Sequence, residues 1–332
     1  MKLLEVKDLK KYYKARGYSG LWRKKQYVEA VGGISFEVNE GEIFGIIGES
    51  GCGKSTLGKL LLDLEKPTGG EILFQGRPIQ EIKKENPALF RRLFQMVFQN
   101  PFDTFLPNET IEEIMLRPLE IHHIGEKYED RKKRIAEMLD KGGLVPPEDF
   151  LNRYPHELSG GQLQRISILR SMLLNPFFLV VDEPISMLDA SVRADIINML
   201  IQLKEEENKS ILFISHDISV IRHVADRMAV MYLGKIVEMG DVGSIIHRPR
   251  HPYTQALISN CASIDIDNVV EKIRITGEAP SPIHPGPGCY FAERCNFACE
   301  KCRKQYPEEK KMADGRMVVC HLVEDGETAY DN

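Results

Sequence analysis

Eight consecutive residues in the first fifth of the chain have the spacing of a phosphate-binding loop. The run Gly48-Glu49-Ser50-Gly51-Cys52-Gly53-Lys54-Ser55 matches the pattern G-x-x-x-x-G-K-[ST], and Thr56 follows it. The glycines let backbone N–H groups curl around the β- and γ-phosphates, Lys54 supplies a positive charge, and the Ser55 hydroxyl completes the Mg²⁺ shell. The segment predicts a nucleoside triphosphate site that includes residues 48–56. Cys52 is expected to be a small tolerated residue, or an exposed, oxidation-sensitive thiol beside Lys54.

Two adjacent carboxylates follow an apolar run later in the chain. Asp182 and Glu183 come directly after Phe178-Leu179-Val180-Val181. If that run is a buried strand, both acids lie at its carboxyl end, where ligands of open α/β folds bind. Asp182 would hold Mg²⁺, largely through water, and Glu183 would act as general base on the attacking water, which typically contributes about 10²–10⁴-fold in rate. Such a pair alone is also typical of a surface turn, and the upstream phosphate loop favours the catalytic interpretation.

The elements that must position these residues are predicted from the apolar pattern. The first part of the chain predicts three strands, a helix and a further strand, at residues 3–9, 34–38, 43–47, 54–63 and 71–74 respectively. The phosphate loop therefore lies between a strand and a helix, which is the order that such a site needs.

The middle of the chain predicts helices and then a parallel sheet. Residues 102–158 have helical spacing, and residues 178–182 and 210–214 read as short buried strands. A crossover helix over residues 191–207 connects these two strands. The arrangement indicates an α/β fold with a helical subdomain inserted into the sheet domain.

Composition restricts the possible classes of protein. The 332 residues are 42% apolar and 28% charged, with a formal net charge of −5, which is typical of a globular protein and gives no indication of nucleic-acid binding. No apolar run approaches the roughly 20 residues needed to span a bilayer, and the N-terminus lacks the features of a secretory signal. We expect a cytoplasmic protein, in which the seven cysteines are more suited to metal chemistry than to disulfides.

The motif Leu158-Ser159-Gly160-Gly161-Gln162 resembles the signature of the ATP-binding-cassette (ABC) ATPases, and the resemblance extends over about residues 3–260. It implies a P-loop, RecA-like core with an antiparallel β subdomain, an inserted helical subdomain and a small Cys-rich C-terminal unit. The expected nucleotide-binding domain covers residues 1–246, with the helical subdomain at about 102–165, and the C-terminal region covers residues 247–332. The matching motifs occur in the family's order: the loop at Gly48, Gln99, the signature at Ser159, the Asp182-Glu183 pair, Ser186 to Asp189, and His216.

The resemblance also implies a mechanism and the roles of single residues. Two such subunits would close head to tail around two MgATP molecules, so that Ser159, Gly160, Gly161 and Gln162 of one chain bind the ATP held by the other. Three further residues take family roles: His216 orients the γ-phosphate, Gln99 links Mg²⁺ and water to the helical subdomain, and Asp189 communicates across the dimer. Tyr13 or its neighbour Tyr12 would stack on adenine. Met187 stands where the family more often has alanine.

Two further segments resemble one subfamily, the oligopeptide/dipeptide and nickel importer ATPases. They are residues 247–257, which include His251-Pro252-Tyr253, and residues 288–295, with the pattern Gly-Cys-x-Phe-x-x-Arg-Cys. The insertion around Trp22 more resembles the second of that importer's two paralogous ATPases. The implied protein is an ATP-hydrolysing translocase subunit on the cytoplasmic face of the membrane, with a paralogous ATPase, two transmembrane permeases and an extracytoplasmic peptide-binding protein as partners. Nickel or another small solute as cargo, and a soluble cassette ATPase with a redox-sensing tail, are alternatives.

Five cysteines lie close together near the C-terminus. The spacing of Cys289, Cys295, Cys302 and Cys320 matches the arrangement that holds a [4Fe–4S] cluster in some members of the subfamily. Structural Zn²⁺ is the alternative, because Cys299-x-x-Cys302 has a spacing that tetrahedral zinc favours. Reduced cysteines in a loop are a weaker alternative, since this tail is expected to lack the apolar residues for a core of its own.

Overall fold

The computed structural model describes residues 1–15, 26–186, 188–260, 285–324 and 327–328, together with single positions between 273 and 283. It divides into two compact units. The first unit comprises residues 1–76 and 213–332, and the second comprises residues 77–212. The insertion around Trp22 and the residue Met187 lie outside the described residues.

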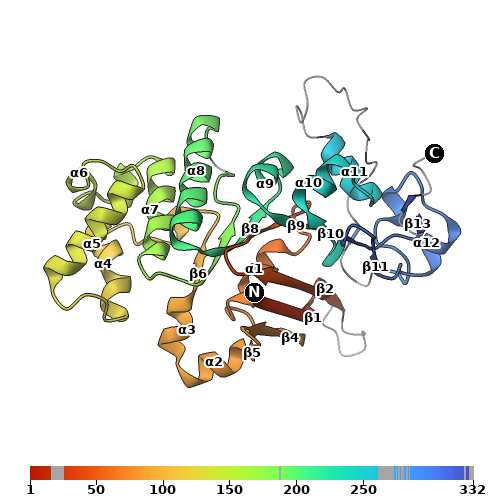
Figure 1. Ribbon diagram of the computed structural model, residues 1–332, viewed down its shortest axis with the longest axis horizontal. Helices are drawn as coiled ribbons and strands as arrows, with labels where there is room; N and C mark the ends of the chain where they lie inside the picture. The colour runs from red at the N-terminus through yellow and green to blue at the C-terminus, as the bar shows by residue number, and fades with distance from the viewer. Residues whose placement is uncertain are drawn as a thin grey trace. The chain divides into compact units, whose positions relative to one another are not determined.

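The first unit contains an antiparallel sheet built from the N-terminal strands (Figure 1). Strand β1 (Lys2–Lys14) lies between β2 (Tyr27–Asn39) and β4 (Gly69–Phe74). In this register Val6 is opposite Phe36 on one side and Ile72 on the other, and all three side chains are buried. These strands form the antiparallel β subdomain that the resemblance implies.

The phosphate loop joins a buried strand to a helix. All five residues of β3 (Ile43–Ile47) are buried, and α1 (Lys54–Leu61) follows the loop. Strand β3 pairs in parallel with β9 (Arg227–Tyr232), which continues as a hairpin into β10 (Lys235–Asp241), and α9 (Ile218–Val224) precedes β9. The β9–β10 hairpin and α9 were not among the predicted elements.

The C-terminal part of the first unit has its own small core. Helices α10 (Val242–His247) and α11 (Pro252–Ser259) precede a segment of short elements that also contains five of the seven cysteines, most of them between those elements. These elements are η3 (Ala292–Arg294), α12 (Glu300–Lys304), β11 (Lys310–Lys311), β12 (Met317–Val318), β13 (Val323–Glu324) and β14 (Glu327–Thr328). Met312, Val318, Cys320 and Val323 form a buried cluster, so the expectation that this tail lacks a core was wrong.

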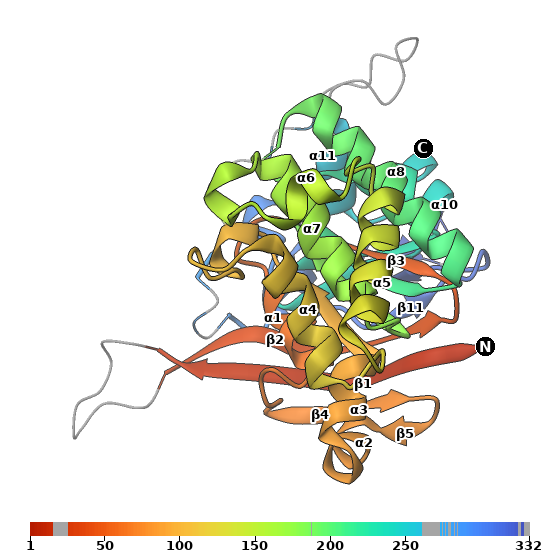
Figure 2. The ribbon, with the colours of Figure 1, turned by 90° about the vertical axis from the view of Figure 1, so that its left-hand side faces the viewer.

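The second unit is mostly helical (Figure 2). Its elements in chain order are β5 (Arg77–Pro78), α2 (Ile79–Glu85), α3 (Pro87–Leu93), β6 (Phe94–Val97), η1 (Pro101–Asp103), α4 (Ile111–Ile121), α5 (Tyr128–Lys141), α6 (Glu148–Leu151), η2 (Pro155–Glu157), α7 (Gly160–Met172), β7 (Phe178–Asp182) and α8 (Ala190–Glu207). Strands β6 and β7 pair in parallel. Strand β8 (Ser210–Ser215) begins in this unit and ends in the first one.

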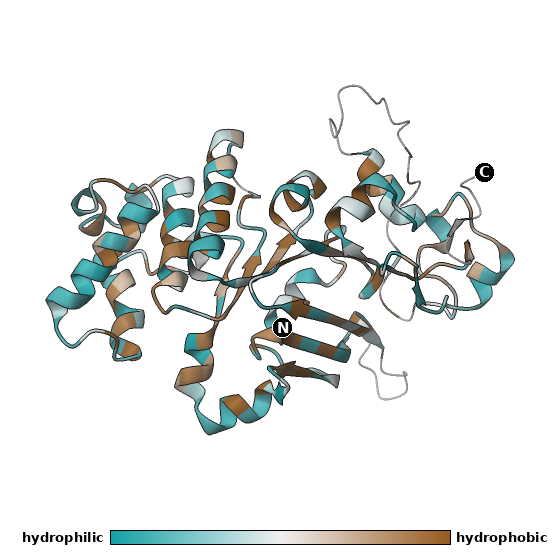
Figure 3. Ribbon diagram, viewed as in Figure 1, coloured by the Kyte–Doolittle hydropathy of each residue, from teal (hydrophilic) through white to brown (hydrophobic). Residues whose placement is uncertain are grey.

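The apolar pattern predicted the buried strands well. The predicted strands at residues 43–47 and 178–182 are confirmed with the same bounds, and those residues are buried throughout. These strands have the sequences IFGII and FLVVD and are apolar along nearly their whole length. Helices α4 and α5 instead carry both apolar and polar residues (Figure 3). Continuous apolar runs are typical of strands covered on both faces, as in parallel sheets.

Candidate nucleotide-binding site

The phosphate loop has the strained backbone that its glycines allow. Gly53, which precedes α1, has φ +107°, and a Cβ atom there would lie 2.0 Å from the carbonyl oxygen of Ala30. The Lys54 side chain is buried, and its ammonium donates to the carbonyl oxygens of Gly48 and Glu49 at 2.8 and 3.1 Å. The loop therefore places a buried cation at the N-terminus of a helix, which is the arrangement that binds phosphate.

Cys52 is not the exposed thiol that the sequence allowed. Its side chain is 4% exposed, and burial raises the pKa of the thiol. A thiol with a raised pKa carries little thiolate and is a poor target for oxidation. The expectation of an exposed, oxidation-sensitive residue was therefore wrong, and the interpretation as a small packed residue agrees with the structure.

Tyr13 lies next to the end of the phosphate loop. Its hydroxyl donates to the Glu65 carboxylate at 2.5 Å, and burial together with this hydrogen bond raises the pKa of Tyr13 to about 12, against a smaller opposing contribution from Thr56. The ammonium of Lys11 lies 4.9 Å from the ring centroid of Tyr13. The phenol is thus held in place beside a residue of the loop, as an adenine-stacking residue must be. That Tyr13, rather than Tyr12, stacks on adenine stays a prediction.

In the second unit, the acidic pair and Gln99 come together. Asp182 is the last residue of β7 and is buried, while Glu183 follows with φ +45°. The Gln99 amide donates to the Glu183 carboxylate at 3.2 Å and to the Ser186 hydroxyl at 3.4 Å. A non-glycine residue in the left-handed region costs of order 1–3 kcal/mol and is typical of functional sites.

The signature residues form the N-terminus of α7. The Ser159 hydroxyl accepts from the Gln162 N–H at 3.3 Å, and the Gln162 side chain accepts from the Ser159 N–H at 3.0 Å, which makes a reciprocal cap. A Cβ atom on Gly161 would lie 2.4 Å from Val192, so glycine allows α7 to approach α8 closely. This cap fixes the partly positive end of a 13-residue helix.

Two further predicted residues are exposed at the ends of elements. His216 follows β8, and Asp189 precedes α8. The family roles assigned to them stay predictions.

The sequence reasoning missed a set of contacts between the C-terminal part and the phosphate loop. Arg294 of η3 donates two hydrogen bonds to the Glu49 carboxylate, at 2.8 and 3.0 Å. The Glu49 backbone N–H donates to the Tyr253 hydroxyl at 2.9 Å. Arg294 and Tyr253 belong to the two segments that resemble the importer subfamily. Nothing in the spacing of those segments relates them to the phosphate loop.

The cysteine-bearing segment brings several thiols near one another. Burial, reinforced by the nearby thiols of Cys289, Cys295 and Cys302, raises the pKa of Cys320 to about 12. The exposed Cys299 has its sulfur 3.4 Å from that of Cys302. Within the residues that the structure describes, no group of three or more His, Cys, Asp or Glu side chains is arranged to hold a metal ion.

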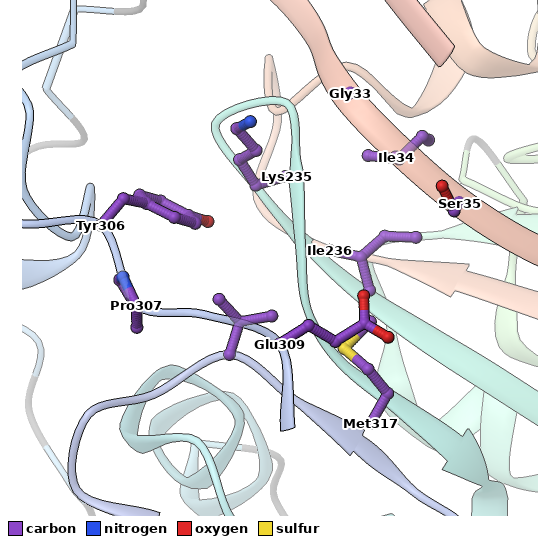
Figure 4. A pocket seen from close by; sticks show the side chains of 10 residues that line it. Gly33, Ile34, Ser35, Lys235, Ile236, Tyr306, Pro307, Glu309 and Met317 are labelled. Atoms are coloured by element: carbon purple, nitrogen blue, oxygen red, sulfur yellow. The ribbon is translucent and has the colours of Figure 1, made fainter. Parts of the chain in front are cut away.

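A separate cavity of about 170 Å³ lies between β2, β10 and the segment after α12 (Figure 4). The ammonium of Lys235 lies 5.4 Å from the ring centroid of Tyr306 and also donates to the Gly32 carbonyl. Both contacts engage the Lys235 ammonium.

Two family descriptions match different parts of the chain. The family described as ABC transporter matches residues 31–186. The family described as the C-terminal region of oligopeptide/dipeptide transporters matches residues 237–302. Fold, loop and signature together define an ATP-binding cassette ATPase.

The relatives that the chain resembles extend over nearly its whole length. It is 45% identical over 324 residues to the oligopeptide transport ATP-binding protein AppF of Bacillus subtilis, covering 96% of this chain and 97% of that one. It is 43% identical over 322 residues to the dipeptide transport ATP-binding protein DppF of Haemophilus influenzae, covering 97% of each. The chain therefore belongs to the family of ABC transporter ATP-binding proteins, and the resemblance drawn from its motifs is confirmed.

A solved structure agrees with this assignment. The ATP-binding cassette MJ0796, in a dimeric post-hydrolysis state bound to ADP and phosphate, is 30% identical, with a TM-score of 0.63. The match covers 72% of this chain and 99% of that one. Among the helices of the described residues, none has the length and apolarity to cross a membrane.

Proposed function

We propose that this chain hydrolyses MgATP to power the import of oligopeptides or dipeptides through a membrane transporter. The observation that carries the proposal is the combination of a buried Lys54 at the start of α1 with the cassette signature at the start of α7. The peptide cargo is supported by the C-terminal region, whose family description is that of oligopeptide/dipeptide transporters. A nickel or other small-solute importer would use the same ATPase chemistry.

Each site residue has a role toward the nucleotide. Lys54 and the backbone N–H groups of the loop bind the phosphates, and Tyr13 stacks on adenine. Ser55, Gln99 and Asp182 would hold Mg²⁺, which would neutralise charge on the phosphoryl oxygens.

Hydrolysis requires a base and a group that orients the γ-phosphate. Glu183 takes a proton from the attacking water, the oxygen of that water bonds to the γ-phosphorus, and ADP leaves. His216 orients the γ-phosphate. The Gln99–Glu183 hydrogen bond at 3.2 Å supports the base assignment, because it holds the carboxylate in one orientation.

The signature is proposed to act on a second cassette subunit. Ser159 and the amides of Gly160, Gly161 and Gln162 would bind the γ-phosphate of ATP held by that subunit, with Asp189 contacting it. The partners would be a paralogous ATPase, two transmembrane permeases and an extracytoplasmic peptide-binding protein. The chain would then lie on the cytoplasmic face of the membrane.

The partners can be identified by affinity purification of the full-length chain from its native membranes in mild detergent. We expect two polytopic membrane proteins, a second cassette ATPase and a solute-binding protein to copurify. Ribosomal or DNA-associated partners without membrane proteins would contradict the transport role. The identity of the solute-binding protein would distinguish peptide from nickel or another solute.

The C-terminal thiols are proposed to hold a [4Fe–4S] cluster through Cys289, Cys295, Cys302 and Cys320. The support for this proposal is the donor set of four thiols within one short segment, one of them on α12, although the described side chains are not arranged as a metal site. Their raised pKa values disfavour thiolates in the free protein, whereas a bound cluster cation would favour them. Structural Zn²⁺ is the alternative.

The cluster is tested by metal analysis of protein purified without oxygen. We expect about four irons and four acid-labile sulfides per chain, with loss of both in Cys320→Ser. Cys299→Ser is the matched control and should keep the iron. If the wild-type protein instead contains one zinc and no sulfide per chain, structural Zn²⁺ takes the place of the proposed cluster.

A further inference from the structure

The second residue of the phosphate loop is held at three of its groups. The Glu49 carboxylate accepts from Arg294, its N–H donates to the Tyr253 hydroxyl, and its carbonyl oxygen accepts from Lys54. Two of these partners come from the C-terminal part of the chain, more than 200 positions away. A residue fixed at its side chain and both peptide groups has little freedom to move independently of them.

The Arg294–Glu49 contact has the geometry of a strong ion pair. Two guanidinium nitrogens bind the two carboxylate oxygens at 2.8 and 3.0 Å. The Arg294 side chain is 9% exposed and that of Glu49 is 30% exposed, so solvent screens the pair only partly. The bidentate fork fixes orientation as well as distance, which a lysine in the same place could not do.

Arg294 is itself held by aromatic residues. One of its nitrogens donates to the Tyr232 hydroxyl at 3.2 Å, and its guanidinium carbon lies 5.8 Å from the centroid of the Tyr232 ring. Tyr232 in turn packs against Tyr253 and Phe291. Arg294 is therefore anchored by the same buried aromatic cluster that holds the Tyr253 hydroxyl.

We propose that Arg294 is a positioning residue for ATP binding, which fixes the phosphate loop and neutralises the carboxylate of Glu49. Glu49 is then the anchor of the loop, and the phosphates are bound by the backbone groups that follow it. The proposal rests on the proposed function of this loop. It makes the C-terminal part of the chain a structural component of the nucleotide site.

Charge provides the physical reason. ATP brings several negative charges to the loop, and an unpaired carboxylate on its second residue would repel them. Pairing with Arg294 removes most of that repulsion and holds the carboxylate in one orientation. Without Arg294, ATP must bind against the free charge and must also order the loop, so its affinity falls.

The test is ATP hydrolysis by the full-length chain in the complex that copurifies with it, with KM and kcat measured separately. For Arg294→Gln we expect a roughly tenfold rise in KM for ATP with kcat changed less than about twofold, because binding rather than chemistry is affected. Arg294→Lys keeps the charge without the fork and should give an intermediate rise. Arg303→Gln is the matched control, because Arg303 pairs with Glu293 in the same segment but both side chains are well exposed.

The double variant separates charge neutralisation from loop fixing. Glu49→Gln combined with Arg294→Gln removes the unpaired carboxylate but does not restore the bidentate fork, so we expect its KM to lie between that of Arg294→Gln and that of the wild type. A KM for Arg294→Gln within twofold of wild type, or a double variant no better than Arg294→Gln alone, would overturn the proposal. A wild-type complex that hydrolyses no ATP would instead contradict the proposed function.

Discussion

At the scale of single residues, the proposed role of Glu183 as general base depends on how its carboxylate is held. Its backbone has φ +45°, and its carboxylate accepts from Gln99. Both features restrict the orientation of a group that must face a water molecule in one direction. Sequence identified these residue types, but neither the strained backbone nor the hydrogen bond could be derived from it.

The general-base assignment predicts the behaviour of Glu183→Gln. Turnover should fall at least about 10²-fold, because the amide cannot accept the proton from water, while ATP binding is kept. Single-turnover hydrolysis and ATP retention measure the two effects. Glu205→Gln, which changes an exposed glutamate of α8, is the control, and normal turnover by Glu183→Gln would exclude the assignment.

The burial of His251 leads us to expect that the free energy of unfolding depends on pH. Burial lowers its pKa from 6.5 to about 3, and its Nδ1 accepts from the Tyr253 N–H at 3.1 Å. Between these two pH values the unfolded chain binds a proton that the folded chain does not, so stability falls as pH drops below 6.5. At pH 5 the loss should be about 2 kcal/mol.

Denaturant unfolding of the full chain at pH 7.5 and pH 5 measures this loss. His251→Asn keeps an acceptor suited to capping α11 but removes the titrating group. Its stability should fall by about 2 kcal/mol less than that of the wild type over the same interval. Equal losses in the two proteins would mean that His251 does not carry the effect.

At the scale of elements, the strand–loop–helix unit depends on two glycines with different surroundings. Gly53 and Gly51 both have positive φ, but a Cβ atom at Gly53 would meet the Ala30 carbonyl oxygen, whereas one at Gly51 would meet nothing within 4 Å. Gly51→Ala should therefore cost only the left-handed strain, about 1–2 kcal/mol. Gly53→Ala should displace the loop and abolish ATP binding. Equilibrium ATP binding with thermal unfolding measures both variants, and equal effects would contradict this account.

The sequence predicted those elements whose pattern is strong. β3 and β7 are continuous apolar runs between polar turns, and their bounds were predicted correctly. Helices α2 and α3 were missed because each has only seven residues and few buried side chains. The tail's core was missed because Met312, Val318 and Val323 come from separate short strands and turns with no periodic pattern.

Sequence could predict only those residues of the nucleotide site that belong to short local motifs. Lys54, Asp182 and the signature follow from spacing, because each chemistry needs its residues within a few positions of one another. The Arg294–Glu49 pair joins residues 245 positions apart, and no local pattern indicates such a contact. Folding brings them together through the Tyr232, Tyr253 and Phe291 cluster.

At the scale of the whole molecule, the chain combines a cassette with a C-terminal region that contacts its phosphate loop. The signature at the start of α7 implies a second cassette, and ATP would then hold the two together. Partner binding and ATP turnover should therefore depend on each other. On the proposed function, this protein is therefore one component of a membrane complex.

The measurement that tests this central claim most directly is peptide uptake by the purified complex reconstituted into lipid vesicles. With MgATP on the side of this chain, we expect a labelled oligopeptide to accumulate in the compartment into which the ATPase faces, and the complex carrying Glu183→Gln to accumulate none. Accumulation that is independent of ATP, or unchanged by Glu183→Gln, would contradict the account.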